Sequence, residues 1–172
     1  ERPAQEREAR GDLLLDVEPA SVARLRLSYP DGSAITVARE GAGWKMTEPL
    51  ATDADATTVE NFLGTIHDTR IERRLLPNEA GALADYGLAG DQGSQARIEV
   101  TTADGRALPA VVLGIATPVG YQAFARRSDG DDYFFAYLDD WPDKRLAFGD
   151  NGKLRIHSAR FAFSVLFVFS PS

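Results

Sequence analysis

The 172-residue chain contains no cysteine, and this absence excludes disulfide bonds, zinc–thiolate sites and thiol catalysis together. It also lacks any run of about 18 apolar residues, so no segment of this sequence is expected to span a membrane by itself. The length suits one domain of ordinary size or two very small ones. A chain of this size can bury a core without a disulfide or a metal ion to stabilise it.

Basic residues are in the minority, because 19 Lys and Arg stand against 26 Asp and Glu, for a formal net charge of −7. An acidic chain gains nothing from releasing the counterions of a phosphate backbone, so we expect no nucleic-acid partner. The charges are interspersed rather than blocked, which is typical of the solvated surface of a globular domain.

Groups suited to catalysis or metal binding are also scarce. His67 and His157 are the only histidines, and their polar neighbours in the sequence project to other sides of the helix or strand. The acidic stretch 128–133 lacks the spacing of a calcium loop, and the acids of 139–143 are typical of a solvated helix start. The glycines of 149–153 lack the spacing of a phosphate loop. The sequence therefore predicts no catalytic residue, no metal ligand and no cofactor.

What the chain does contain is a repeated segment. Residues 23–32 (ARLRLSYPDG) and 96–105 (ARIEVTTADG) align without gaps. Each begins with Ala-Arg, alternates apolar and polar residues as a half-buried strand does, and ends in Asp-Gly, a strong hairpin-turn signal. Both halves of the chain therefore begin with a β-hairpin, either through true internal duplication or through chance similarity of two amphipathic hairpins.

In the first half, the alternation in 33–40 and in 43–47 extends this hairpin into a three-stranded antiparallel meander, which Pro49 ends. The Thr and Asp side chains of 52–55 are typical of a helix start. The helix that follows has an apolar stripe that can lie across the meander, formed by Val59, Phe62, Leu63 and Ile66. In this region Trp44 is predicted to be a core anchor between the meander and the helix.

The expected fold is α+β, with two antiparallel hairpin or meander units, the first covered by the amphipathic helix. The charged residues 1–12 resemble a juxtamembrane tether, residues 13–90 form the first unit and residues 91–172 the second. The two units form either one compact domain or two closely packed halves. Because the chain begins at Glu1 without a methionine, we expect an upstream segment to have been removed.

Further elements follow from local patterns. The sequence predicts an edge-like strand at 70–76, a short helical turn closed by Gly87, hairpin turns at 104–105, 128–131 and 151–152, a short helix or loop at 139–148, and a buried apolar strand at 161–169.

Aromatic residues gather in one predicted hairpin of the second half. Because its second strand (YFFAYL) has apolar residues on both faces, this hairpin either packs in the core or offers one face to a partner or ligand. The candidate surface consists of Tyr121, Phe124, Tyr133, Phe135 and Tyr137.

Taken in order, several short motifs resemble the bacterial domain-of-unknown-function family 4340. They are GxGW with W-x4-P (41–49), an acidic helix start, DYGL (85–88), LG…TP.GY (113–121) and a Tyr/Phe-rich strand. The resemblance covers about residues 13–148, and the chain departs from the family pattern after Phe148, where a further strand-rich repeat would be expected.

The resemblance implies a location rather than a reaction. Family members have one N-terminal transmembrane helix followed by an extracytoplasmic domain, and many are encoded beside ABC transporters of the gliding-motility or auxiliary type. The family has no established catalytic residues to carry over. We therefore expect a non-catalytic module anchored to the inner membrane, periplasmic or extracytoplasmic, with a protein partner such as a transporter subunit. A lipid- or glycan-binding module is the alternative, and an enzyme is disfavoured.

Overall fold

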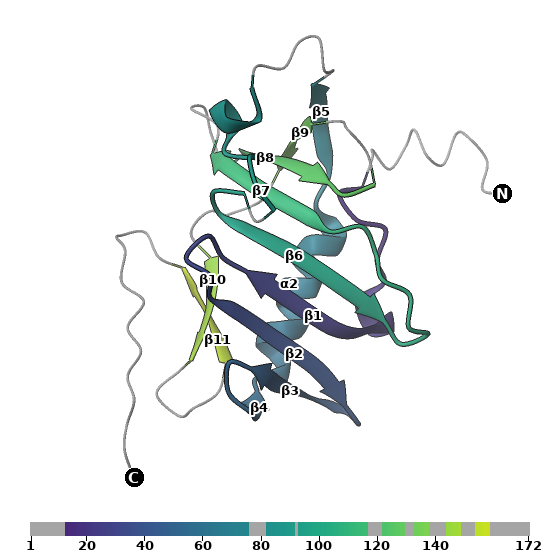
Figure 1. Ribbon diagram of the computed structural model, residues 1–172. Coiled ribbons are helices and arrows are strands. Elements are labelled where there is room, and N and C mark those ends of the chain that lie inside the picture. The colour runs from purple at the N-terminus through teal and green to yellow at the C-terminus, as the bar shows by residue number, and fades with distance from the viewer. Residues whose placement is uncertain are drawn as a thin grey trace, which may run out of the picture.

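The computed structural model describes residues 13–75, 82–91, 93–116, 122–129, 133–137, 144–148 and 154–158. Within these residues eleven strands form one sheet, in the order β10-β11-β4-β3-β2-β1-β6-β7-β8-β9-β5 (Figure 1). All pairings are antiparallel except that of β11 with β4. The strands are β1 (Val22–Ser28), β2 (Ala34–Glu40), β3 (Gly43–Glu48), β4 (Thr52–Ala54), β5 (Ile71–Leu75), β6 (Ala96–Thr102), β7 (Val111–Ala116), β8 (Gln122–Arg127), β9 (Tyr133–Tyr137), β10 (Lys144–Phe148) and β11 (Leu154–Ser158).

The helices of the described residues are α2 (Ala56–Asp68) and two short 3-10 helices, η1 (Pro19–Ser21) and η2 (Leu83–Tyr86). Together with the mostly antiparallel sheet they confirm the α+β class. None of these helices is both long and apolar enough to cross a membrane.

Helix α2 begins at its acidic cap, because the Asp55 side chain accepts a hydrogen bond from the Thr58 amide at 2.8 Å. Figure 1 shows α2 behind the middle strands of the sheet. The predicted apolar stripe is the buried side of the helix, formed by Val59, Phe62, Leu63 and Ile66. On its flank, Glu60 Oε1 accepts hydrogen bonds from Trp44 Nε1 and Arg39 Nη2, each at 2.9 Å. These bonds fix the helix to β2 and β3.

The main core lies between α2 and one face of the sheet, and both halves of the chain contribute to it. Leu25 of β1, Ile98 of β6 and Leu113 of β7 belong to the same buried cluster as the helix residues. Trp44, which is 3% exposed, is also part of this cluster, so its prediction as a core residue is confirmed.

A smaller cluster lies on the opposite face of the sheet, at its β7–β8 end. Val112 alternates with Val111 and Leu113 along β7, so its side chain points away from the main core. It packs with Leu88 and Phe124 beneath the segment that contains η2. This segment ends as the sequence predicts, with Gly87 in the left-handed conformation at a φ of 66°.

Two strands differ from the predictions. The short helix or loop expected over 139–148 is wrong for Lys144–Phe148, which form β10. This segment pairs antiparallel with β11, the next strand along the chain, and the pairing overrides the local preference of a charged sequence. Strand β4 is missed because its three residues are too few for a visible alternation. The predicted tether at 1–12 and the predicted strand at 161–169 lie outside the described residues.

Candidate functional site

The aromatic surface predicted from the sequence needs one correction. Phe124 is 6% exposed, and its ring centroid lies 4.6 Å from that of Tyr86, so it is a core residue of the smaller cluster. Tyr121 lies outside the described residues, as do the side chains of Tyr133, Phe135 and Tyr137. For these four residues the partner surface stays a prediction.

The histidine near the end of α2 has a local structural contact. His67 Nδ1 lies 2.6 Å from the Val17 carbonyl oxygen, which ties the end of the helix to the segment before η1. Among the described residues, no group of three or more histidines and carboxylates lies close enough together to hold a metal ion.

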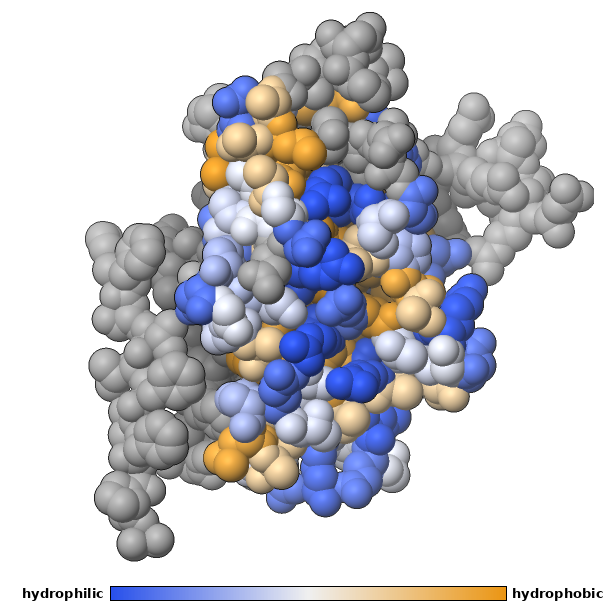
Figure 2. Space-filling model, viewed as in Figure 1, coloured by the Kyte–Doolittle hydropathy of each residue, from blue (hydrophilic) through white to orange (hydrophobic). Residues whose placement is uncertain are grey.

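Polar chemistry is concentrated instead on the sheet face opposite α2. Along β1, Arg24 and Arg26 alternate with the buried Leu25 and Leu27, so the two arginines project from this open face. On the neighbouring strand β6, Ile98 and Val100 are buried. The side chains that alternate with them, Arg97, Glu99 and Thr101, therefore also project from the open face. Figure 2 shows hydrophilic side chains gathered in a band across this face.

Four charged side chains of the open face, from strands β3, β1 and β6, form a continuous row, which we call the charge ladder: Glu48, Arg26, Glu99 and Arg97. Arg26 forms an ion pair with Glu48 of β3, and its Nε lies 3.9 Å from Oε2 of Glu99. Glu99 in turn forms an ion pair with Arg97, whose Nε lies 3.3 Å from Glu99 Oε1. The signs alternate along the ladder, so each carboxylate has an arginine beside it.

A buried hydroxyl supports one end of the charge ladder. Thr36 of β2 is fully buried, and its Oγ1 donates to Glu48 Oε2 at 2.8 Å while it accepts from Arg26 Nη1 at 3.3 Å. The hydrogen bond from Thr36, assisted by the positive charge of Arg26, lowers the pKa of Glu48 below its ordinary value of 4.5. Glu48 is therefore a carboxylate at neutral pH.

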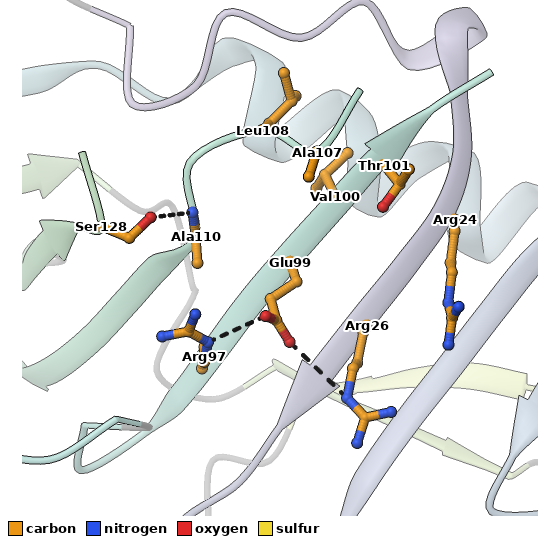
Figure 3. A pocket seen from close by; sticks show the side chains of 10 residues that line it. All are labelled: Arg24, Arg26, Arg97, Glu99, Val100, Thr101, Ala107, Leu108, Ala110 and Ser128. Atoms are coloured by element: carbon orange, nitrogen blue, oxygen red, sulfur yellow. Dashed lines mark hydrogen bonds and ion pairs between the residues drawn. The ribbon is translucent and has the colours of Figure 1, made fainter. Parts of the chain in front are cut away.

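Beside the ladder lies an open groove of about 390 Å³, which we call the arginine groove (Figure 3). Arg24, Arg26 and Arg97 line it together with Glu99, and the connection between β6 and β7 forms the opposite side. That side is held in place by Ser128, whose Oγ accepts a hydrogen bond from the Ala110 amide at 2.9 Å.

The arginines of the groove differ in how fully their donors are used. Arg97 donates to the Asp91 carbonyl oxygen at 3.2 Å and forms an ion pair with Glu99. Arg24 is exposed, and within the described part of the chain its guanidinium makes no hydrogen bond and no ion pair; it acts on Glu48 only at a distance. An arginine carries five N–H donors, so the groove contains donors available to a ligand.

The segments of this site follow from the sequence, but their arrangement into one site does not. Arg24 and Arg97 are the arginines of the two Ala-Arg repeats, and strand alternation already places them on the face opposite the core. What the sequence does not show is that β1 and β6 are neighbours in the sheet. Without that pairing the two arginines belong to separate hairpins.

The arrangement can hold an anion by charge-assisted hydrogen bonds, because arginine presents planar paired donors that match a carboxylate or a phosphate. Glu48 and Glu99 already occupy part of this capacity. Besides its arginines, the groove is lined by the hydroxyl-bearing Thr101 and Ser128 and by small side chains, which suits the binding of an anionic group.

Comparison with known protein families gives a match from β3 onward. The model of the family described as "Domain of unknown function (DUF4340)" matches residues 44–147, more than half of the chain. The matched region includes α2 and β6, whereas Arg24 and Arg26 precede it. No curated protein and no solved structure matches the chain.

Proposed function

The chain belongs to the DUF4340 family, and from this premise we propose that it is a non-catalytic interaction module, tethered to a membrane outside the cytoplasm and accessory to an ABC-transporter-type complex. The location and the transporter are the expectations attached to the family resemblance. The described structure contributes the surface through which such a module would act.

The observation that carries the proposal is the open sheet face with its arginine groove. A sheet covered by a helix on one face presents the other face to its surroundings, and here that face is charged at its centre. Arginine is enriched at protein interfaces because it combines charge, planar hydrogen bonding and a long aliphatic stem. The groove places three arginines on one open surface of an otherwise acidic chain.

A module for a lipid or glycan is the second candidate, and it predicts a concave pocket with mostly apolar walls between the two units. The groove lies at the junction of the two halves, between β1 and the β6–β7 connection, but it is open and lined by charged side chains. This favours a protein partner over an apolar ligand.

We further propose that the two halves are an internal duplication. In the alignment of the repeats Leu25 corresponds to Ile98 and Leu27 to Val100, and in the sheet Leu25 pairs with Val100 and Leu27 with Ile98. Arg26 pairs with Glu99, its own counterpart in the repeat, so the local two-fold axis of this antiparallel pair passes through the middle of the repeated segment. The strand order supports this symmetry, since β4-β3-β2-β1 is followed by β6-β7-β8-β9.

In the same proposal, α2 belongs to the first half as its cover. The bonds from Trp44 and Arg39 to Glu60 support this assignment, because they join the helix to two strands of the first meander.

Site-specific photo-crosslinking of the full-length, membrane-tethered protein tests the interaction function. A crosslinking amino acid at Thr101, which lines the groove, is compared with one at Asn61, which is exposed on the outer side of α2. We expect the crosslinking amino acid at position 101 to form crosslinks to a transporter subunit, which mass spectrometry identifies.

Asn61 is the matched control, because it lies on the opposite face of the same domain. Crosslinks to a protein from Asn61 but none from Thr101 would contradict the use of the open face. A co-purified lipid or glycan without any crosslinked protein would favour the ligand-binding alternative.

A further inference from the structure

We infer that the arginine groove binds carboxylate side chains of an extended acidic segment of the partner protein. The inference rests on the proposed function, which supplies the partner, and it adds the chemistry that would recognise that partner. Four features of the groove and the charge ladder carry it: an unused arginine, an incompletely used arginine, two resident carboxylates and the spacing of the donors.

Arg24 is the primary anchor. It is exposed, it lines the groove, and it makes no hydrogen bond or ion pair within the described residues. Arg26 is the second donor: its Nε is 3.9 Å from Oε2 of Glu99, which is beyond hydrogen-bond distance. A ligand carboxylate beside β1 can therefore accept from Arg24 without displacing an existing bond, and it can take the unfilled position at Arg26 Nε.

The charge ladder shows which anion this face already accommodates. Glu48 and Glu99 each lie against an arginine, Glu99 with its Oε1 at 3.3 Å from Arg97 Nε. A carboxylate from a partner would extend the same alternating pattern by one step, to Arg24. The groove and ladder contain three arginines and two glutamates, so the net charge of this set is positive and attracts an anion.

The two resident glutamates favour carboxylates over a phosphate. A phosphate group concentrates a charge near −2 at one position beside Glu48 and Glu99, whereas an extended peptide places single carboxylate charges about 7 Å apart. The other side of the groove also suits a polypeptide, because Ala107, Leu108 and Ala110 offer small and aliphatic surface to the chain between the acidic residues.

The spacing of the donors favours an extended segment. Arg24 and Arg26 are two residues apart on one strand, which separates their Cα atoms by about 7 Å. An extended peptide presents alternate side chains on one side at the same repeat of about 7 Å. Acidic residues at alternate positions would therefore meet the two arginines in register.

The net charge of −7 does not prevent this binding. At physiological ionic strength, interactions between exposed charges are largely screened beyond about 8 Å, so the charges nearest to the bound carboxylate dominate. Around the groove these are the three arginines and the two glutamates of the ladder.

The experiment measures binding of the 172-residue chain to a fluorescent peptide of alternating serine and glutamate, by anisotropy, beside the matched serine–glutamine peptide. We expect the glutamate peptide to bind and the glutamine peptide not to bind. Arg24→Gln should weaken the binding at least about tenfold, the loss expected for hydrogen bonds to a charged group. Because Arg24 is exposed, this variant should fold normally.

Lys45→Gln is the control variant, since it removes one positive charge from an exposed side chain of β3 outside the groove. Equal weakening in both variants would overturn the inference, because it would show attraction by charge alone. Inorganic phosphate that competes as well as acetate would overturn the assignment to carboxylate. No binding of the glutamate peptide would overturn the inference while the crosslinks from Thr101 still decide the interaction function.

Discussion

Thr36 shows how a single buried hydroxyl organises charge on the open face. Its side chain is fully buried, yet it both donates to Glu48 and accepts from Arg26, so its hydrogen-bonding capacity is used on two charged partners. Because the Thr36 side chain is short and buried, its oxygen has a fixed position and holds the Glu48 carboxylate, and thereby Arg26, in place in the ladder.

The lowered pKa of Glu48 makes a prediction for acid stability. A carboxyl whose pKa is lower in the folded than in the unfolded chain stabilises the fold above its ordinary pKa of 4.5, and this contribution is lost as the pH falls through the folded value. Glu48→Gln should therefore be less stable than wild type at neutral pH and lose less stability on acidification. Urea unfolding at about pH 7, 5 and 3 measures both effects.

Asp104 is a second carboxyl with a lowered pKa, and it accepts hydrogen bonds from the Thr102 hydroxyl and the Arg106 amide. Asp104→Asn should therefore change the pH dependence of stability in the same direction as Glu48→Gln. If Glu48→Gln and wild type lose the same stability between neutral and acid pH, Glu48 does not have the lowered pKa in solution.

At the residue scale, the sequence identifies the types of side chain on each face but not their partners. Alternation is sufficient to place Arg24, Arg26 and Arg97 away from the core. It does not predict that Glu99 lies between Arg26 and Arg97, because that depends on the register of two strands about 70 residues apart in the chain. Phe124 shows the same limit, since its burial depends on the η2 segment lying over it.

At the element scale, α2 is the test of how the main core is stabilised. Phe62 is 2% exposed in this core, so truncation removes apolar contacts and leaves a cavity. We expect Phe62→Ala to lower the free energy of unfolding by about 3–5 kcal/mol. Chemical denaturation gives this value, with Asn61→Ala, at the exposed neighbouring position, as a control that should change stability by less than about 0.5 kcal/mol. A loss under about 1 kcal/mol for Phe62→Ala would show that the helix does not close the core.

The η2 segment packs closely on the strand beneath it. A Cβ atom on Gly114 of β7 would lie 2.0 Å from the Tyr86 carbonyl oxygen and 3.0 Å from Leu88 Cδ2. Gly114→Ala should therefore push residues 83–88 away from the sheet and cost about 1–3 kcal/mol, as overpacking does. Hydrogen exchange of the Leu88 amide, which donates to Leu83 at 2.9 Å, should become faster.

Gly64→Ala is the matched control for this substitution. Gly64 lies within α2, and a Cβ there meets no atom within 4 Å, so alanine should stabilise the helix by up to about 1 kcal/mol. If Gly114→Ala were as stable as Gly64→Ala, the close packing of η2 on β7 would be wrong.

Elements with strong local signals are the ones that the sequence predicts well. The first meander, α2 with its Asp55 cap and the Gly87 turn each follow from alternation, helical periodicity or a positive φ. Strands β4 and β10 fail this test, because one is only three residues long and the other is charged. Their existence depends on neighbouring strands rather than on their own residues.

At the scale of the whole molecule, the pairing of β1 with β6 determines the architecture. It joins the two meanders into one sheet and creates both the main core and the open face on which the groove lies. The repeat in the sequence predicts two similar hairpins, but any arrangement of the two is compatible with it. Contacts between strands far apart in the chain leave no local pattern, so this level of organisation comes only from the structure.

The shared core leads to the last prediction, that the two halves unfold together. Leu25 and Ile98 lie on the paired strands β1 and β6 and are buried in one cluster. Separating the two halves would therefore expose the core of both. The slowest-exchanging amides of β2 and of β7 should therefore open with the same free energy, within about 1 kcal/mol, and with the same denaturant dependence. Native-state hydrogen exchange measures this, with residues 83–88 as an internal example of local opening. If β7 opened at a free energy more than about 2 kcal/mol below that of β2, the chain would consist of two separately stable units, and the groove between them would depend on their docking.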